Sequence, residues 1–391
     1  MQTLFLNKDQ ERRLLAGHLW IYSNEIDAKR SPLKQFQAGE LVKIIAASGR
    51  MLGVGYINPN CLLCVRLLSK EDVQIDEAFF KERIQKAIAL RERLFPLPFY
   101  RAVYGESDGL PGLVIDRYDD VWVLQANTAG VDQRINFVID ALIKLMPVKT
   151  IMLCNDSSQR KLEGLEQYRK IIYGEELDHC RILENECNFL APLMTGQKTA
   201  WFYDHRANRR MISQLSKNKV VLDVFSYLGA FTLPCAKQGA KHVIAIDASA
   251  AAVEQLLANA KNNSLHQVEG IKEDAFVALQ NFINDKEKFD VIILDPPALI
   301  KKKKDFNAGL QAYQKLNELA LQVLNPEGLL FSASCSMHLS GEDLRSIIRK
   351  AALRQKKNIK ILKYCHQDYD HPIHPTILET EYLKGFLITL D

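Results

Sequence analysis

The pattern of hydrophobic and polar positions divides the chain into three stretches. Residues 1–72 carry short alternating runs such as ELVKII and VGYI between turn residues, and this period of two predicts the strands of a small β-rich unit. Residues 73–190 mix two periods: helices are expected over 76–94 and around 134–145, and strands at GLVIDRY, VWVLQAN and KTIMLCN. This order predicts a small central α+β domain.

From residue 191 to 391, short apolar runs alternate with amphipathic helical patterns. VVLDVFSY, HVIAIDAS, FDVIILDPP and GLLFSASCS each predict a buried strand with a polar or small residue at its end, and helices are expected over 250–263 and 310–324. Buried strands separated by helices indicate a parallel sheet covered on both faces, and thus an α/β fold. Ligands of such folds bind at the carboxyl ends of the strands, so the residues there are the candidates for chemistry.

Length and composition add little to this division. A chain of 391 residues is long for one core, and its 25% charged residues and mean hydropathy of −0.13 are ordinary for a globular protein. No apolar run approaches the ~20 residues of a membrane span, and the first residues lack a signal-peptide pattern, so a cytoplasmic location is expected. The net charge of +4 is compatible with a nucleic-acid partner but also with many acidic substrates.

The eight cysteines form no framework of disulfides, so free thiols are expected. Cys61 and Cys64 have the spacing of half a zinc site, but no second pair follows, and buried strand cysteines are the better interpretation. His371 and His374 could resemble a metal pair, yet the prolines around them deny them a common helix face. We therefore expect no metal.

Acidic residues follow three successive predicted strands. The first loop, Asp223 to Phe231, has a single glycine and not the GxGxxG of a pyrophosphate site, so it suits a cationic ligand without phosphate. Asp247 follows 24 residues later, where a carboxylate accepts hydrogen bonds from a ribose, and Asp274 is placed to accept from an adenine amine. Each acid alone could be a helix cap; together they indicate S-adenosylmethionine.

The last two strand ends carry residues suited to methyl transfer. Asp295-Pro296-Pro297 resembles the (D/N)PP(F/Y) signature of amino-methyltransferases, but Ala298 replaces the aromatic residue and argues against a nitrogen target. Cys335, flanked by two serines, lies 40 residues beyond Asp295. A thiolate that adds to carbon 6 of cytosine activates carbon 5 for methylation, while Asp295 and the Pro296 carbonyl could hold the base. The alternative is that Cys335 is a small buried residue.

Basic residues near these motifs are candidates for RNA binding. The run Lys301-Lys302-Lys303-Lys304 could clamp phosphates beside the target base, although charge runs are usually solvated loops. Arg12, Arg13 and Trp20 in the first unit could form an RNA surface, with the alternative that Trp20 belongs to the core.

The chain resembles the RlmI-type family of large-subunit (23S) rRNA cytosine-5 methyltransferases. Specific segments are GESDGLPGLVID, GQKTAWFYDHR, FSYLGAF, LDPP, SCS, DHP and YLKGF. The resemblance implies an N-terminal PUA-like RNA-binding domain (1–72), a central α+β domain (73–190) and a C-terminal Rossmann-like class I methyltransferase domain (191–391). It also implies a ribosomal RNA partner and allows a homodimer.

The resemblance implies that Cys335 is the nucleophile and that Asp295 lines the cofactor pocket; Cys335 and Asp295 are the catalytic candidates. The cofactor-binding candidates are Asp204, Asp223, Phe225, Ser226, Tyr227, Gly229, Phe231, Asp247, Ala248, Ser249, Asp274, Ala275 and Asp295. Two segments depart from the family pattern: DPPAL replaces DPPKF, and Asp204-His205-Arg206 replaces Asp-Gln-Arg. The rival readings are an enzyme of the same fold that methylates a guanine nitrogen, and a non-catalytic RNA-binding protein. The modified nucleotide, the substrate's assembly state and the base that removes the carbon-5 proton stay open.

Overall fold

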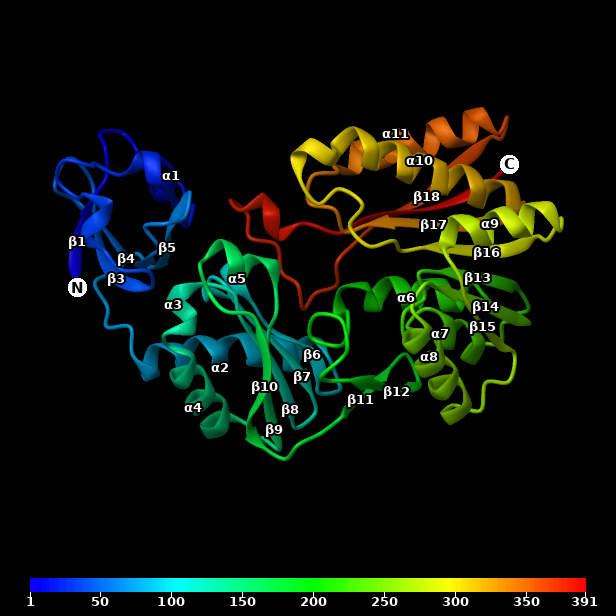
Figure 1. The fold of residues 1–391 in the computed structure, drawn as a ribbon, viewed down its shortest axis with the longest axis horizontal. Helices are drawn as coiled ribbons and strands as arrows, with labels where there is room; N and C mark the ends of the chain where they lie inside the picture. The colour runs from blue at the N-terminus through cyan, green and yellow to red at the C-terminus, as the bar shows by residue number, and fades with distance from the viewer. The chain divides into compact units, whose positions relative to one another are not determined.

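A computed structural model describes residues 1–391, whose contacts divide the chain into two compact units (Figure 1). Unit 1 holds Met1–Cys180, Pro192–Tyr203 and Tyr369–Thr380; unit 2 holds Arg181–Ala191, Asp204–Asp368 and Glu381–Asp391. The chain therefore passes between the units five times. No helix is both long and apolar enough to cross a membrane.

Unit 1 begins with a five-stranded sheet in the order β1-β3-β4-β5-β2. Its elements are β1 (Gln2–Phe5), α1 (Arg12–Leu15), β2 (Trp20–Tyr22), β3 (Glu40–Ile45), β4 (Met51–Ile57) and β5 (Leu63–Ser69). Apolar side chains from all five strands fill one core, and β3 alternates between buried and more exposed positions as predicted. β4 and β5 are buried on both faces, because Val54, Tyr56 and Leu68 pack in a second core with residues of the second sheet. Cys64 is fully buried in β5, but Cys61 precedes the strand and is only half-buried, so the expectation of two buried strand cysteines is wrong for Cys61.

The second sheet of unit 1 has the order β10-β9-β8-β7-β6 and carries helices on one side. Its elements are α2 (Glu77–Leu94), β6 (Phe99–Tyr104), β7 (Leu113–Tyr118), β8 (Val121–Ala126), α3 (Ala129–Asp132), α4 (Ile135–Leu145), β9 (Thr150–Asn155), α5 (Ser158–Leu162) and β10 (Tyr168–Gly174). Asp76 caps α2 by accepting from the Phe79 amide at 3.0 Å. The predicted helix, strands and second helix of this region are all present.

The loop Gly105–Asp108 with Gly109 bonds to three elements of unit 1, namely α2, β6 and β2. Asp108 accepts two hydrogen bonds from Arg91, at 2.6 and 2.8 Å, and one from the Tyr104 amide. Glu106 accepts from the Trp20 indole at 3.0 Å, and the side chain of Arg83 donates to the Gly109 carbonyl. This part of the GESDGLPG segment is therefore a hydrogen-bonding hub, which its turn-rich composition alone does not predict.

Residues 369–380 attach to the second sheet through a buried network of charges. The Arg91 guanidinium donates to the Asp370 carbonyl at 2.9 Å, and Arg101 pairs with Asp116 through two bonds of 2.9 Å. His371 lies between Arg101 and Asp370, at 3.0 Å and 2.7 Å, and is almost fully buried. These hydrogen bonds account for the Asp370-His371-Pro372 segment as a structural tether within unit 1.

Unit 2 is a seven-stranded sheet in the order β15-β14-β13-β16-β17-β19-β18. Its elements are β13 (Val220–Val224), β14 (His242–Asp247), β15 (Val268–Lys272), β16 (Phe289–Leu294), β17 (Leu324–Ser334), β18 (Ile359–His366), β19 (Lys384–Leu390), α6 (Arg206–Gln214), α7 (Thr232–Lys237), α8 (Ala250–Asn262), α9 (Ala275–Asn284), α10 (Phe306–Val323) and α11 (Gly341–Arg354). A hairpin of β11 (His179–Glu184) and β12 (Cys187–Pro192) precedes them.

The first five strands of this sheet are parallel, and helices cover both faces (Figure 1). α6, α7 and α8 lie on one face and α9, α10 and α11 on the other, so the α/β prediction is confirmed. The final strand β19 runs antiparallel and inserts between β17 and β18. The expectation of a purely parallel sheet is therefore wrong for β19, which follows β18 without an α-helix between them. β18 follows α11 and runs in the same direction as the first five strands, although its one partner in the sheet is the antiparallel β19.

Candidate active site

The predicted site residues follow strands that are neighbours in the sheet. Asp223 is the penultimate residue of β13, Asp247 ends β14, Asp274 follows β15, Asp295 follows β16 and Cys335 follows β17. Because these strands are parallel and adjacent, their carboxyl ends share one edge of the sheet. The structure thus brings the three acids, the DPP segment and the SCS segment to a common edge.

The loop after β13 has an unusual backbone. Phe225 and Tyr227 have φ angles of +69° and +49°, a region that side chains other than glycine rarely adopt. The amides of Phe225 and Ser226 both donate to the Ile246 carbonyl at 2.9 Å, which ties the loop to β14. At Gly229, with φ of +84°, a Cβ atom would lie 2.5 Å from Leu233. Such strain concentrates at ligand sites, and the predicted residues Phe225 to Phe231 coincide with it.

Asp247 supports this loop from the neighbouring strand. One carboxylate oxygen accepts from the Tyr227 amide at 3.0 Å, and the other accepts from the Ser249 amide at 2.9 Å. Ser249, and not Asp247, caps α8 by accepting from the Ala252 amide. Ala248 and Ser249 are exposed beside Asp247. Asp247 therefore keeps lone pairs at a half-exposed position on the sheet edge.

Asp274 is the N-terminal cap of α9. Its Oδ1 accepts from the Phe276 amide at 2.9 Å and the Val277 amide at 3.2 Å, while Ala275 is buried behind it. Of the three acids that could have capped a helix, Asp274 is the one that does so. Only Oδ1 is used, so the exposed second oxygen is still able to accept a hydrogen bond from a ligand.

Asp223 is buried with one oxygen satisfied and one not. Thr232 donates to Oδ2 at 2.6 Å, whereas Oδ1 has no protein partner, and the same is true of the buried Ser226 hydroxyl. Burial raises the pKa of Asp223 to about 7. Buried polar atoms without partners are uncommon in native proteins, so this pair fits a loop that receives a polar ligand.

His205 lies against Asp295, an arrangement that the sequence prediction missed. Its Nε2 is 3.1 Å from Asp295 Oδ1, and its ring packs between Phe231 and Phe331 at centroid distances of 5.5 and 5.9 Å. Burial alone would lower the pKa of His205, but the neighbouring Asp295 outweighs it and raises the pKa. Asn208 contacts Nδ1 at 3.1 Å, which leaves the Nε2 proton directed at Asp295. The only signal in the sequence was the departure Asp204-His205-Arg206.

Asp204 precedes His205 and is buried. The Tyr382 hydroxyl donates to its carboxylate, and its carbonyl accepts from the Asp368 amide at 2.9 Å. These bonds hold the short turn Tyr203–His205 and so position His205. They show a structural role for Asp204 and leave its predicted part in cofactor binding a prediction.

The SCS segment is a turn in which the two serines point inward. Ser334 donates to the Tyr313 hydroxyl at 2.7 Å, and the Tyr313 and Ser336 hydroxyls are 2.9 Å apart. The Ser336 amide donates back to Ser334 Oγ at 3.1 Å, and the Ile300 amide donates to Ser336 Oγ at 3.2 Å. Both serines are fully buried while Cys335 between them is half-buried. The network presents the thiol and also links this turn to the segment after Asp295.

The other seven cysteines have the character of buried, unreactive thiols. Burial raises the pKa of each, for example to about 12 at Cys64 and Cys235 and about 11 at Cys61 and Cys365. Six of the seven are buried, and Cys61, the exception, lies 3.2 Å from the Leu162 carbonyl. A thiol with a raised pKa is a poor nucleophile at neutral pH, so these seven cysteines are poor candidates for the nucleophile.

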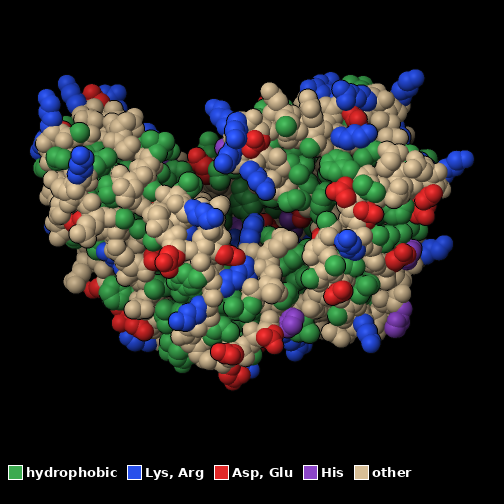
Figure 2. All heavy atoms as spheres, in the orientation of Figure 1, with side chains coloured by type: hydrophobic (Ala, Val, Ile, Leu, Met, Phe, Trp, Pro, Cys, Tyr) green, Lys and Arg blue, Asp and Glu red, His purple; other side chains and the backbone are tan.

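The RNA-binding candidates differ in their exposure and in the partners that they already have within the protein. Lys301 to Lys304 are exposed, whereas Pro296 is buried behind Asp295. Figure 2 shows further Lys and Arg side chains gathered over α10 and α11. Arg12 is exposed and pairs with Asp9, Arg13 bonds Glu25, and Trp20 is half-buried with its indole N–H on Glu106. Trp20 is thus neither a fully buried core residue nor a fully exposed surface residue.

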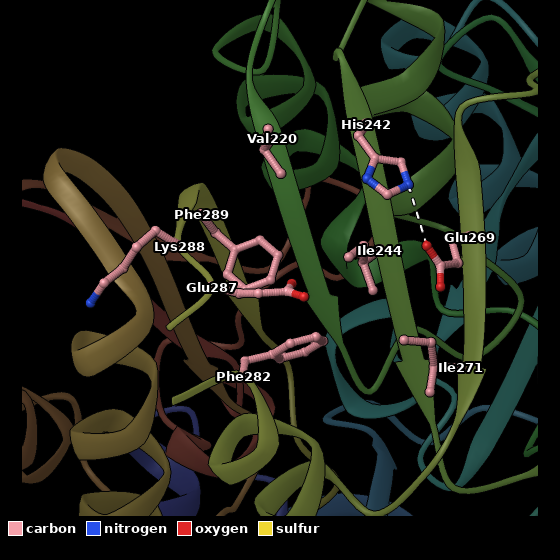
Figure 3. A pocket seen from close by; sticks show the side chains of 9 residues that line it. All are labelled: Val220, His242, Ile244, Glu269, Ile271, Phe282, Glu287, Lys288 and Phe289. Atoms are coloured by element: carbon pink, nitrogen blue, oxygen red, sulfur yellow. Dashed lines mark ion pairs between the residues drawn. The ribbon is translucent and has the colours of Figure 1, made fainter. Parts of the chain in front are cut away.

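The pocket in Figure 3 lies at the opposite edge of the sheet from these residues. It has a volume of about 420 Å³ and includes Val220, His242 and Phe289, the first residues of β13, β14 and β16. In Figure 3, His242 and Glu269 point toward one another from neighbouring strands, 3.5 Å apart. The amino ends of parallel strands are not where ligands of this fold bind. No group of three or more His, Cys, Asp or Glu side chains in the structure could hold a metal ion.

Known proteins resemble the chain over its whole length. Residues 4–70 match the PUA-like domain, and residues 199–356 match the family described as conserved hypothetical protein 95. A ribosomal RNA large subunit methyltransferase I from Tolumonas auensis is 38% identical and covers 99% of this chain and 98% of its own. The protein of that name from Aliivibrio fischeri strain ES114 is 34% identical, with 98% of each chain covered.

A solved structure shares the fold. A protein described as a methyltransferase, in complex with SAH, matches 100% of both chains with a TM-score of 0.86 and 22% identity. At this identity the likeness shows the fold alone, whereas the curated relatives confirm the resemblance drawn from GESDGLPG, FSYLGAF and SCS. The chain therefore belongs to the ribosomal RNA large subunit methyltransferase I family.

Proposed function

We propose that the chain methylates carbon 5 of a cytosine in large-subunit ribosomal RNA, with Cys335 as a transient covalent nucleophile and S-adenosylmethionine as methyl donor. The methyl transfer and the ribosomal substrate follow from the names of relatives that match almost the full chain. The choice of cytosine depends on one observation. Cys335 is held half-exposed on the same sheet edge as the candidate cofactor acids, by serines that both point away.

The chemistry requires the thiol because carbon 5 of cytosine is a weak nucleophile. Addition of the Cys335 thiolate to carbon 6 pushes electron density toward carbon 5, with a proton taken up at N3. When bound, the cofactor supplies an electrophilic methyl group on its sulfonium. A base then removes the carbon-5 proton, the bond between Cys335 and carbon 6 breaks, and N3 gives back the proton it had taken up, which restores the aromatic ring and the thiolate.

Asp295 and His205 are suited to hold the target base. The Asp295 carboxylate and the Pro296 carbonyl can accept hydrogen bonds from the exocyclic amine. His205, 3.1 Å from Asp295, fixes the orientation of the carboxylate and can supply the proton that N3 needs. Ala298 stands where enzymes that methylate an amino group have an aromatic residue to stack on the base, and this disfavours a nitrogen target.

The loop after β13 is suited to the cofactor. Asp223 Oδ1 and Ser226 Oγ are buried acceptors without protein partners, and Asp247 keeps lone pairs for a ribose. Asp274 Oδ2 can accept from an adenine amine. These groups fit a ligand with a positively charged amino acid part and no phosphate, because three of them are carboxylates, which attract a cation and repel a phosphate.

The experiment compares purified wild-type protein with Cys335→Ser and Cys335→Ala, using large-subunit RNA fragments and labelled S-adenosylmethionine. Both variants should lose methylation by a factor of about a thousand or more, as expected when a covalent nucleophile is removed. Cys61→Ser is the matched control because Cys61 is the other half-exposed thiol, and it should keep full activity.

The position of the methyl group separates the rival functions. Nuclease digestion and mass spectrometry of the product should find 5-methylcytidine and no methylguanosine. A methyl group on a guanine nitrogen, or normal turnover by Cys335→Ala, would rule out the proposed mechanism. A wild-type protein that binds S-adenosylhomocysteine but methylates no RNA would favour the non-catalytic reading.

A further inference from the structure

Lys384 is a buried lysine at the sheet edge that carries Cys335. It begins β19 and lies opposite Ser334 of β17 and His366 of β18. Only 5% of the residue is exposed. It belongs to the YLKGF segment, to which the sequence assigned no chemistry. A buried ammonium is costly unless it has partners, so the position needs an explanation.

The Lys384 ammonium is attached to the turn that presents the thiol. Nζ donates to the Ser336 carbonyl at 2.6 Å, directly after Cys335, while the backbone of Lys384 pairs with Ser334, directly before it. The charge of Cys335 acts on the Lys384 ammonium. One lysine thus contacts both neighbours of the thiol and lies within electrostatic reach of the thiol itself.

We propose that Lys384 is a positioning residue that keeps Cys335 as a thiolate and fixes the SCS turn. The inference deepens the proposed function and rests on it for the use to which the thiolate is put. When the thiolate forms, Cys335 gives its proton to solvent, and Lys384 keeps its own proton throughout. The opposite charge lowers the free energy of the thiolate and so its pKa.

The groups around Lys384 are consistent with this role. Burial lowers the pKa of Lys384 to about 8, while Cys335, Glu381 and Asp343 act in the opposite direction. Tyr313 of α10 bonds both serines, and burial raises the pKa of its hydroxyl, so it stays neutral. The two carboxylates belong to the segment before β19 and to α11. The ammonium is therefore the cation that these neighbours support at neutral pH.

The test measures thiol reactivity, which needs neither RNA nor cofactor. Full-length protein is treated with iodoacetamide from pH 5 to 10, and alkylation of the Cys335 peptide is followed by mass spectrometry. In the wild type the rate should rise with a midpoint below ~8.5, the ordinary value for a thiol, whereas Cys61 should react only at higher pH. Lys384→Met should raise the Cys335 midpoint by about one unit or more.

Two control variants test whether the effect comes from the positive charge at position 384. Lys384→Arg keeps the charge but cannot act as a base, so it should restore a low midpoint and exclude a role as proton acceptor. Lys357→Met removes another lysine that donates to a backbone carbonyl, that of Leu321, and should leave the Cys335 midpoint unchanged. Methylation should fall in Lys384→Met mainly through kcat at neutral pH and recover partly at higher pH.

A Cys335 midpoint equal in wild type and Lys384→Met would overturn the inference. So would a wild-type midpoint at or above ~8.5, and this measurement needs no variant, so a Lys384→Met protein that fails to fold leaves the test intact. If Cys335→Ala retains full methylation while the midpoint still depends on Lys384, the proposed function fails and the electrostatic pairing stands.

Discussion

Several single residues of this protein hold conformations or charges that isolated side chains avoid. Asp223 is buried with a raised pKa, His205 is buried beside a carboxylate, and Phe225 and Tyr227 have positive φ angles. The burial of Asp223 and the positive φ angles cost stability, whereas His205 is stabilised by Asp295, and all of these residues lie at the carboxyl edge of the unit 2 sheet. Costs gathered at one place indicate a site selected for binding and not for stability.

Replacement of Asp223 by Asn should change the pH dependence of stability. Because the pKa of Asp223 is about 7 in the folded protein, the folded state binds a proton that the unfolded state has lost above its ordinary pKa. The wild-type apoprotein should therefore lose stability as pH rises from about 4 to 7, and Asp223→Asn should lose less.

Melting temperatures from pH 5 to 8 measure this difference. The same variant should bind S-adenosylhomocysteine more weakly, because its Oδ1 acceptor has less charge, and calorimetry would record the loss. Parallel melting curves of the two proteins over this pH range would show that Asp223 is not protonated in the folded state.

His205 offers a second prediction at this scale, through paired substitutions. A glutamine, the residue typical of the family, can donate the same hydrogen bond to Asp295, so His205→Gln should keep activity within about tenfold. His205→Ala leaves Asp295 without its partner and fills less of the space between Phe231 and Phe331. We expect kcat to fall by about a hundredfold or more in His205→Ala.

The raised pKa of His205 also sets a pH trend. Its ion pair stabilises the folded protein fully below the ordinary pKa of about 6.5, and this contribution disappears as pH rises through the folded pKa. The difference in melting temperature between wild type and His205→Gln should therefore shrink from pH 6 to pH 9. A difference that grows with pH would contradict the pairing with Asp295.

At the scale of elements, periodicity was informative where strands and helices alternate. The strands ending near Asp223, Asp247 and Asp295 are found where the apolar runs predict them, and α2 and α8 begin within a residue or two of their predicted starts. β18 and β19 could not be ordered from the sequence, because insertion of one strand between two earlier ones depends on long-range pairing. For the same reason the links of Tyr313 and Lys384 to the SCS turn were not predicted.

A glycine in α10 tests how this helix supports the catalytic loops. A Cβ atom at Gly309 would lie 2.2 Å from the Ile300 side chain and 3.1 Å from the Leu299 carbonyl. Alanine gains about 1 kcal/mol of helix propensity over glycine, but the displaced Ile300 would disturb the segment bonded to Ser336. Gly309→Ala should thus lower methylation several-fold, measured at fixed RNA concentration, whereas the exposed Asn307→Ala on the same helix should not. Equal activity of the two variants would show that Ile300 moves without consequence.

At the scale of the whole molecule, the positions of the basic residues say more about RNA binding than the net charge of +4 does. Lys301 to Lys304 follow the DPP segment, on the sheet edge that carries the candidate site. If they bind phosphates, changing all four to alanine should reduce the slope of log affinity against log salt by up to about 3 for single-stranded RNA. Filter binding at several salt concentrations measures the slope.

A matched control carries the same loss of charge at the opposite edge of the sheet. The exposed lysines near the starts of β13 and β14 are Lys217, Lys219, Lys237 and Lys241. Their replacement by alanine should change the salt slope much less. Equal changes of the salt slope in the two quadruple variants would mean that RNA affinity depends only on the net charge of the protein.

The chain order alone does not describe how the molecule is built. The boundaries at 72 and 190 follow changes of pattern and stay a prediction, whereas contacts place Tyr369–Thr380 with unit 1, far from it in sequence. The buried bonds of Asp370 and His371 give the reason, and they depend on partners more than 250 residues away. Composition and periodicity are local properties and carry no information about such pairs.

The insertion of β19 between β17 and β18 has a consequence for synthesis. A ribosome makes residues 384–390 after all the other strands of this sheet, and until they emerge β17 has an open edge and the turn around Cys335 lacks the bond from Lys384. The carboxyl edge of the sheet is therefore completed only after β18 has been made. A chain that stops before residue 384 would have the loop after β13 but not the bond between Lys384 and Ser336, and β18 would have no strand to pair with.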